Sequence, residues 1–384
     1  MLKIIIGIFA AVVAAIFITT QDVDIKETND ESIAIQIEEI DTSGIEEIDT
    51  SGIEEIDISE IEFKKLSKPR PLITNTVTNS DELYDVLLKA NNGDVIYIPG
   101  QIKVDLTPTL KKNKNKYPPR FEIPAGVTIM GDGERFGENG AILYITDDVK
   151  DEVFRLNEGV NVIGLRIKGP GIDCDLVGLQ AYISPEDTII IENCEIWGWN
   201  NAAIRNRGDS TKLSLRNNMI IRNNYIHDTI FGTGYGIATA FNSYTLIEYN
   251  KFSNNRHDVS ASGKYGCDYT FRYNTNISHW TNQKTGKKAH IVDVHGWPFD
   301  ARIKPEDRKR NRQAGSRIEI YGNHFKDSGD NEVIHIRGIP EFYIRIYDNK
   351  FASTNATPIE QKYIDVSDSS KKMEIKNNRF RVKF

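Results

Sequence analysis

Histidine, aspartate and arginine residues gather in one stretch of this 384-residue chain. Six of the seven histidines fall between residues 257 and 335. Imidazole is the side chain that most readily exchanges a proton near neutral pH, and a neighbouring carboxylate orients it and tunes its pKa. The concentration of these residue types predicts a site for general acid–base chemistry or for ligand binding.

Alternation of side chains along short strands predicts which of these groups face solvent. In the segment 290–295 two valines suit the core, which turns Asp293 and His295 outward. In the segment 333–337 two isoleucines suit the core, which turns His335 and Arg337 outward. These four residues are the first candidates for a catalytic role.

The same alternation extends this outward strip to neighbouring segments. In the segment 257–262 Val259 and Ala261 suit the core, so Asp258 is expected outside. An earlier segment turns Arg205 outward, and a later one turns Asp365 outward. If the strands stack at roughly 4.8 Å, these groups share one face. The further candidates for substrate contact are His257, Asp258, His290 and Arg205.

Three kinds of chemistry fit such a strip. The His and Asp side chains can exchange protons with a substrate. Asp293 and His295 can also ligate a metal ion, since carboxylates favour Ca²⁺ and imidazoles favour transition metals. Arg337, Arg310 and Arg312 can pair with the carboxylates of uronic acids through their planar forks. The plain alternative is that long solvated strands need polar outer faces and use these residues for that purpose.

Three tryptophans bear on the substrate. Trp197 and Trp199 follow a predicted strand in a turn, and Trp297 comes just after the segment 290–295. Exposed indoles are good platforms for sugar rings. The alternative is that they cover the core beneath a loop. The segment 283–316 is rich in Lys and Arg without apolar periodicity, which predicts a long loop over the same face.

A repeated phrase predicts the elements that position these residues. Two apolar residues two positions apart are followed by Asn and then by another apolar residue. Most copies are 24 to 30 residues apart. The 49-residue gap between Asn274 and Asn323 corresponds to two turns, or to one turn with a large insertion. The slot holds Asn224, Asn250, Asn274, Asn323, Asn349 and Asn378, with Cys194 and Leu165 in two earlier copies.

This period is typical of a solenoid whose turn contains three short strands. The apolar pair fills a core, and Asn suits the turn because it tolerates strained geometry and bonds neighbouring backbone. Stacked copies place Asn above Asn. Leucine-rich repeats also use Asn, but their Leu-rich consensus is absent here. The prediction is an all-β, single-stranded, right-handed parallel β-helix.

The remainder of the chain predicts an anchor and a stalk. Residues 1–20 contain an apolar run from Ile4 to Thr20, read as a signal peptide or a membrane anchor. Residues 21–71 form an acidic, low-complexity linker, with a net charge of −15 from Gln21 to Phe63. Since the whole chain carries −7 and Lys3 adds +1, residues 64–384 sum to +7. Either reading of the first segment exports the predicted β-helix domain, residues 72–384.

The start of that domain is also readable. Ser80 to Ala90 has a helix N-cap, early acidic residues and an apolar stripe, which predicts a helix covering the first coil. Val95 to Ile98 then reads as a strand. The three cysteines form no disulfide framework, and no metal-type spacing of Cys and His is present.

The helix followed by NGDVIYIPG, then IPAGVTIMGDG and the Asn phrases, resembles the pectate-lyase-like superfamily of right-handed parallel β-helix proteins. The resemblance covers about residues 72–384. It implies the fold, whereas members of that superfamily include lyases, hydrolases, epimerases and proteins without catalysis. Members often carry an Asp-His pair and an Arg-rich segment, which Asp293 to Gly296 and Arg308 to Gly315 resemble in a different internal order.

Two functions follow as hypotheses. The first is an exported, cell-surface protein that binds an acidic polysaccharide and cleaves it as a lyase or a hydrolase. The alternative is a non-catalytic surface module that binds glycan or a cell-envelope component. Either form would contact the membrane if the first segment stays uncleaved. No cofactor is required by the sequence, although Ca²⁺ fits the acidic candidates. Nucleic acid is not expected as a partner, because no known binding module is present.

Overall fold

The chain divides into two units, Met1–Lys68 and Pro69–Phe384. The computed structural model describes residues of the second unit only, and the predicted segments 1–20 and 21–71 lie outside them. No helix among the described residues is long and apolar enough to cross a membrane. The described ranges are 74–113, 119–149, 151–181, 187–208, 216–230, 232–282, 286, 289–298, 312–326, 333–352, 364–366 and 372–384.

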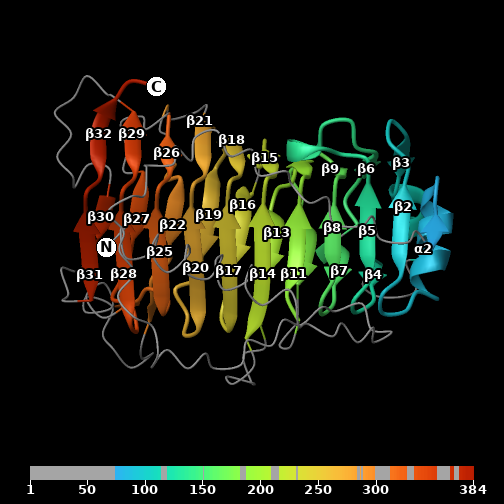
Figure 1. Cartoon of the computed structure of the whole chain (residues 1–384), viewed down its shortest axis with the longest axis horizontal. Coiled ribbons are helices and arrows are strands. Elements are labelled where there is room, and N and C mark those ends of the chain that lie inside the picture. Colours follow the sequence, from blue (N-terminus) through green and yellow to red (C-terminus); the bar gives the residue numbers. More distant parts are fainter. Residues whose placement is uncertain are drawn as a thin grey trace, which may run out of the picture. The chain divides into compact units, whose positions relative to one another are not determined.

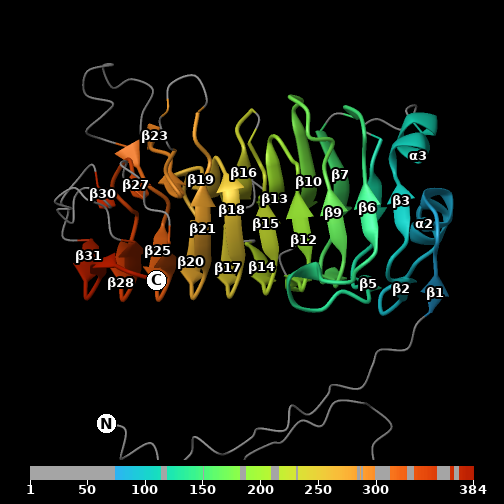
Figure 2. The same cartoon turned by 90° about the horizontal axis from the view of Figure 1, so that it is seen from above.

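Three parallel sheets run along the second unit, and from β2 onward the chain visits them in rotation, interrupted only by the small antiparallel pair β23–β24 among the described strands (Figures 1 and 2). Sheet A contains β1 (Asn75–Thr76), β2 (Val95–Ile98), β5 (Thr128–Gly131), β8 (Asn161–Ile163), β11 (Ile189–Glu192), β14 (Asn217–Arg222), β17 (Ser243–Glu248), β20 (Cys267–Arg272), β25 (Arg317–Tyr321), β28 (Tyr343–Tyr347) and β31 (Met373–Lys376).

Sheet B follows sheet A in each coil. It contains β3 (Lys103–Asp105), β6 (Ile142–Tyr144), β9 (Arg166–Lys168), β12 (Glu195–Trp197), β15 (Tyr225–His227), β18 (Lys251–Asn255), β21 (Thr275–His279), β26 (His324–Phe325), β29 (Lys350–Ala352) and β32 (Arg379–Val382).

Sheet C closes each coil and carries the predicted strip. It contains β4 (Phe121–Ile123), β7 (Asp151–Leu156), β10 (Leu176–Ala181), β13 (Ala202–Asn206), β16 (Tyr235–Thr239), β19 (His257–Ala261), β22 (Val292–Val294), β27 (Ile334–Ile336) and β30 (Ile364–Val366). The rotation through three parallel sheets confirms the predicted β-helix.

Apolar side chains of all three sheets stack into one continuous core. Phe325 and Phe351 stack with ring centroids 4.9 Å apart, and Phe380 continues the stack at 5.1 Å from Phe351. Phe325 and Phe351 are fully buried. Burying each such side chain contributes about 1.5–3 kcal/mol, so the stacked column is a main source of stability.

A buried ladder of asparagine amides runs beside this core at the corner between sheets A and B. In each rung Nδ2 donates to Oδ1 of the next Asn at 2.9–3.1 Å, from Asn224 to Asn378. The same Nδ2 also donates to a backbone carbonyl of the preceding coil, as Asn274 does to Ile247 at 2.9 Å. Cys194 fills a rung as a buried small residue, and its backbone N–H donates to Asn224 at 2.8 Å. The predicted Asn-on-Asn stacking is confirmed.

The residue before each ladder position adopts a left-handed conformation. Its φ lies between 55° and 66° in every coil from Gly164 to Asn377. Gly, Asn and Asp tolerate this region, whereas a bulky side chain there costs on the order of 1 kcal/mol. Six of the eight positions carry tolerant residues, and two carry tyrosine: Gly164, Asn193, Asn223, Tyr249, Tyr273, Gly322, Asp348 and Asn377.

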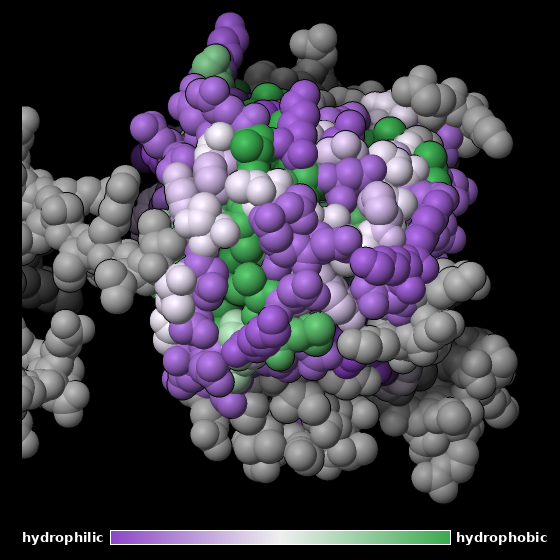
Figure 3. Space-filling view, turned by 90° about the vertical axis from the view of Figure 1, so that its right-hand side faces the viewer, coloured by the Kyte–Doolittle hydropathy of each residue, from purple (hydrophilic) through white to green (hydrophobic). Residues whose placement is uncertain are grey.

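Helix α2 (Ser80–Leu87) lies at the first coil, and a shorter helix, α3 (Thr107–Lys112), packs nearby. Leu83 and Leu87 of α2 are part of the core. The N-cap is Asn79, whose side chain accepts from the backbone N–H of Glu82, rather than Ser80. Ser80 instead bonds Thr109 of α3 at 2.7 Å. Seen end-on in Figure 3, this end shows mainly hydrophilic residues with a narrow strip of hydrophobic ones.

The long gap between Asn274 and Asn323 is one coil with an insertion. These two residues are adjacent rungs of the ladder, with Nδ2 of Asn274 3.1 Å from Oδ1 of Asn323. The insertion follows β22 and includes an antiparallel pair, β23 (Trp297–Pro298) and β24 (Arg312–Gln313). Residues 299–311 of the predicted loop lie outside the described residues.

We predict that Asn274→Ala lowers the free energy of unfolding by about 2–4 kcal/mol, because it removes the hydrogen bonds that Asn274 makes with the Ile247 carbonyl and with the backbone N–H and side-chain amide of Asn250. Urea unfolding measures this cost. The matched control is Asn378→Ala at the half-buried last rung, which should cost less. A loss below about 1 kcal/mol for Asn274→Ala would contradict a stabilising role of the buried ladder, and equal losses would contradict the dependence on burial.

Candidate functional site

The predicted outward strip exists on sheet C. Asp293 of β22 lies directly beside His335 of β27, and beside Ser260 of β19 on its other side. The column continues to Ala238 and then to Arg205 of β13. Because the strands are parallel and in register, residues far apart in sequence become neighbours. His295 and Arg337 follow two positions later, just after β22 and β27 end.

Asp293 is the centre of a charged cluster. Its side chain is 1% exposed, and its Oδ2 pairs with the Arg337 guanidinium. The same oxygen lies 3.2 Å from Nε2 of His295 and 3.7 Å from Nε2 of His257. Burial alone would raise the pKa of Asp293, but the contact with His295 and the charge of Arg337 hold it well below its usual range. Asp293 is therefore a carboxylate at neutral pH.

His257 is buried and neutral. Its Nδ1 lies 2.6 Å from the carbonyl oxygen of His290, which can only accept, so Nδ1 carries the proton. Burial lowers the pKa of His257 to about 4, against the opposing effect of Asp293 and the His290 carbonyl. Its unprotonated Nε2 consequently faces Asp293, and a proton placed there would form an ion pair with that carboxylate.

His290 and His335 form a second imidazole contact next to this cluster. Nδ1 of His335 lies 2.8 Å from Nε2 of His290, so one ring donates and the other accepts. The ring centroids are 4.3 Å apart in an edge-on arrangement. The pair extends the histidine-rich surface from β22 to β27.

A cavity of about 450 Å³ lies beside the cluster on sheet C, and we call it the sheet C groove. Small residues of β16 and β19 contribute to its lining, and the larger groups are Arg205, Tyr235, His295 and Trp297. The Tyr235 ring meets the His295 ring edge-on, with centroids 6.3 Å apart. A substrate in this groove would therefore touch the exposed face of the Asp293 cluster.

Positive charge surrounds the sheet C groove. Lys264 places its ammonium 4.0 Å from the Trp297 ring and 4.7 Å from the Phe241 ring. Arg207 lies over the same Phe241 at 5.0 Å. Burial, and then the charge of Arg207, lower the pKa of Lys264. With Arg205 in the lining, these cations suit a negatively charged ligand.

The structure brings together most of the predicted site residues. Asp293, His295, Arg337 and His257 converge, and His290 and His335 lie beside them. Arg205 and Trp297 line the groove. Sequence reasoning missed Tyr235 and Lys264. Alternation could not have found Tyr235, because Ile237 two positions later faces the core; its place is seen only from its pairing with His257 in the sheet.

Asp258 does not face outward as predicted. It is 1% exposed and accepts hydrogen bonds from Asn255 at 3.0 Å and from Asn276 at 2.8 Å. The backbone N–H groups of Asp258 and Val259 both donate to the Ile291 carbonyl, so simple alternation fails at the start of β19. Asp258 thus turns into an interior polar cluster, away from the sheet C groove.

The prediction that Trp199 is an exposed platform for sugar rings is wrong. Its side chain is fully buried, and its Nε1 lies 3.4 Å from the carbonyl oxygen of Ile167. Its ring packs where Gly169 and Gly178 leave room for it. Arg310 lies outside the described residues. Only the backbone of Arg312 is described, in β24, so its predicted contact with a uronate stays a prediction.

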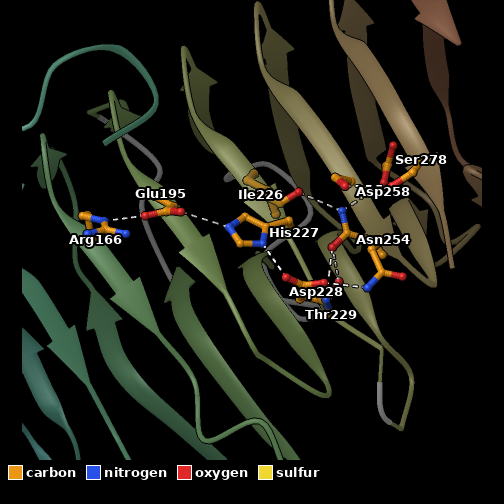
Figure 4. A network of polar contacts seen from close by, with 11 residues as sticks. Arg166, Glu195, Ile226, His227, Asp228, Thr229, Asn254, Asp258 and Ser278 are labelled. Carbon is orange, nitrogen blue, oxygen red and sulfur yellow. Dashed lines mark hydrogen bonds and ion pairs between the residues drawn. The ribbon is translucent and has the colours of Figure 1, made fainter. Parts of the chain in front are cut away.

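Trp197 lies beside a separate polar cluster on sheet B, in which Figure 4 shows Glu195, His227 and Asp228. Its ring stacks on His227 with centroids 5.7 Å apart. His227 lies 3.2 Å from Glu195 and 2.7 Å from Asp228, and Glu195 also pairs with Arg166. Burial would lower the pKa of His227, but the two carboxylates outweigh it and raise that pKa. Trp197 therefore helps to hold strands together, at a distance from the sheet C groove.

Among the described residues, no group of three or more His, Cys, Asp and Glu side chains is placed to hold a metal ion. Oδ1 of Asp293 has no hydrogen-bond partner within the described ranges. The proposed Asp293 and His295 ligands for Ca²⁺ or another metal thus remain a prediction from sequence.

A family model described as right handed beta helix region matches residues 157–279. Together with the sheet topology, it confirms the right-handed β-helix and, at the level of the fold, the resemblance seen in the sequence. No curated protein matches the chain.

Two solved structures are similar to this chain at a TM-score of 0.40. One is an alginate lyase from a Paenibacillus species, with 14% identity over 80% of this chain and 95% of that one. The other is the A-module of a mannuronan C-5 epimerase from Azotobacter vinelandii, with 10% identity over 78% and 93%.

The burial of Asp258 predicts that the free energy of unfolding depends measurably on pH. Burial raises its pKa to about 7, despite the opposing hydrogen bonds from Asn255 and Asn276. Since an unfolded Asp titrates near pH 3.9, the folded state holds the proton longer, and stability falls as pH rises from about 4 to about 7. Asp258→Asn should remove this decrease in unfolding free energy between about pH 4 and pH 7, and it should raise the unfolding free energy at pH 8.

Urea unfolding of both proteins at pH 5 and pH 8 tests this expectation. The new amide can donate to Oδ1 of Asn276, which has no partner in the described part of the chain. Asp348→Asn, on the exposed corner, is the control and should leave the slope unchanged. If the unfolding free energy of Asp258→Asn depended on pH as that of the wild type does, the raised pKa of Asp258 would be contradicted.

Proposed function

We propose that this chain is an exported, surface-tethered protein that binds an acidic polysaccharide in the sheet C groove and cleaves it by β-elimination. One observation carries the proposal: the ionised Asp293, paired with Arg337, lies beside His295 in the lining of a groove that Arg205 also lines. Export and tethering rest on the apolar segment 1–20 and the acidic linker 21–71.

Elimination from a uronate chain needs three groups that the groove supplies. A guanidinium must neutralise the uronate carboxylate, and Arg205, which lines the groove, is the candidate. A base must take the proton from the adjacent carbon, which we assign to His295 oriented by Asp293. An acid must protonate the leaving oxygen, which we assign to the Tyr235 hydroxyl.

The step balances as written. The C–H bond next to the carboxylate breaks and its proton goes to His295, while its electron pair forms the new C=C bond. The C–O bond to the next sugar breaks, and the leaving oxygen receives the Tyr235 proton. The products are one chain with an unsaturated end and one with a free hydroxyl. His295 and Tyr235 then exchange protons with solvent.

Elimination is favoured over hydrolysis by the composition of the groove. Most glycoside hydrolases use two carboxylic side chains on either side of the scissile bond. None of the groove's described lining residues is Asp or Glu, and Asp293 is already paired with Arg337. The same pairing also suits a non-catalytic glycan-binding module, which is the second candidate.

The test is incubation of the full chain with polyuronates and neutral polysaccharides, with and without Ca²⁺. Unsaturated ends that absorb in the ultraviolet would support elimination. New reducing ends without that absorbance would establish hydrolysis instead. Binding without either product would replace the enzyme by the binding module.

We expect His295→Ala and Asp293→Asn to lower the rate of elimination by about 10²–10⁴-fold, the usual contribution of a positioned acid or base. His324→Ala is the matched control, because His324 lies on sheet B away from the groove. It should retain the wild-type rate. Wild-type rates in the His295 and Asp293 variants would refute this site.

A further inference from the structure

Four tyrosines form a stripe along the corner between sheets A and B. Tyr249 and Tyr273 have ring centroids 5.3 Å apart, and Tyr273 meets Tyr321 edge-on at 5.5 Å. Tyr321 stacks on Tyr347 at 4.7 Å. The four residues come from four consecutive coils, so the stripe runs parallel to the axis of the β-helix. Sheet C and its groove form the side across from this corner.

Backbone geometry does not explain two of these tyrosines. Tyr249 and Tyr273 occupy the left-handed position before a ladder Asn, with φ of 57° and 55°. The other coils use Gly, Asn or Asp there, which tolerate that conformation. Strained positions that persist tend to mark functional sites. We therefore infer that the tyrosine rings in these two successive coils have a function of their own.

Burial does not explain them either. Tyr249 is 44% exposed and Tyr273 is 45% exposed, so neither ring fills the core. Large aromatic side chains that remain this exposed, side by side, commonly mark an interaction surface.

Neighbouring residues hold the stripe in place. The Tyr273 ring lies against the backbone of Gly322, where an added Cβ would come within 2.6 Å of two ring carbons. Arg272 donates to the Tyr321 hydroxyl at 2.9 Å and also pairs with Glu248. The rings are thus preorganised, which lowers the entropic cost of binding a ligand.

We propose that this tyrosine stripe is a glycan-binding surface, separate from the sheet C groove, that holds a polysaccharide chain along the axis of the β-helix. Aromatic rings contact the C–H groups of pyranose rings, and phenol hydroxyls bond sugar hydroxyls. Coils stack at roughly 4.8 Å, so the rings repeat at a spacing of the order of one sugar residue. Binding here does not depend on whether the groove cleaves its ligand.

The test variant is Tyr249→Asn combined with Tyr273→Asn in the full chain. Asn is the residue that other coils place in this slot, as at Asn193 and Asn223, so the fold should be retained and its unfolding temperature not lowered. The matched control is the double change to Phe, which keeps the rings. Affinity electrophoresis in soluble polygalacturonate and in neutral barley β-glucan measures binding.

We expect about tenfold weaker retardation for the Asn variant, as for the loss of two ring contacts, and a much smaller change for the Phe variant. Loss in both glycans assigns the stripe to pyranose rings in general, and loss in polygalacturonate alone assigns it to acidic chains. Cleavage of a short uronate oligosaccharide should stay unchanged.

Three outcomes would overturn the proposal. Unchanged binding of both glycans by the Asn variant would show that the rings bind no sugar. A lowered unfolding temperature with unchanged binding would make the stripe structural. Equal loss of binding and of oligosaccharide cleavage would place the affected contacts in the groove instead.

Discussion

The buried amide ladder is the interaction on which the rest of this structure depends. Each Asn from Asn224 to Asn349 bonds the amide of the next Asn and a backbone carbonyl and a backbone N–H of neighbouring coils, inside the core. A shift of one residue would leave these groups unpaired and would turn every side chain to the opposite face of its strand. The ladder thereby sets the register of three sheets at once.

The register between neighbouring strands places residues that are far apart in the sequence next to one another in the site. Asp293 and His335 are 42 positions apart, yet they pair directly because β22 and β27 follow adjacent rungs. The low-dielectric surroundings then make Asp293 a strong partner for Arg337 and His295. The same arrangement leaves the opposite corner to exposed tyrosines, so one repeat serves two faces with different chemistry.

Much of this could be predicted from residue types alone. The Asn phrase and the alternation of apolar residues were enough to orient Asp293, His295, His335 and Arg337. Alternation failed for Asp258, where two successive N–H groups bond one carbonyl. It also gave no information on Trp199, whose burial depends on distant glycines. Three-dimensional packing, and not local pattern, decided both.

The coil between Asn274 and Asn323 has a consequence for evolution. It spans 49 residues, yet its two rungs meet at the same 3.1 Å as the rungs of a 24-residue coil. Inserted sequence leaves from β22 and returns before β25 without disturbing the stack. The sequence inserted between β22 and β25 can therefore be lengthened, shortened or replaced while the stacked coils stay the same. Diversification of ligand preference would then require no change to the core.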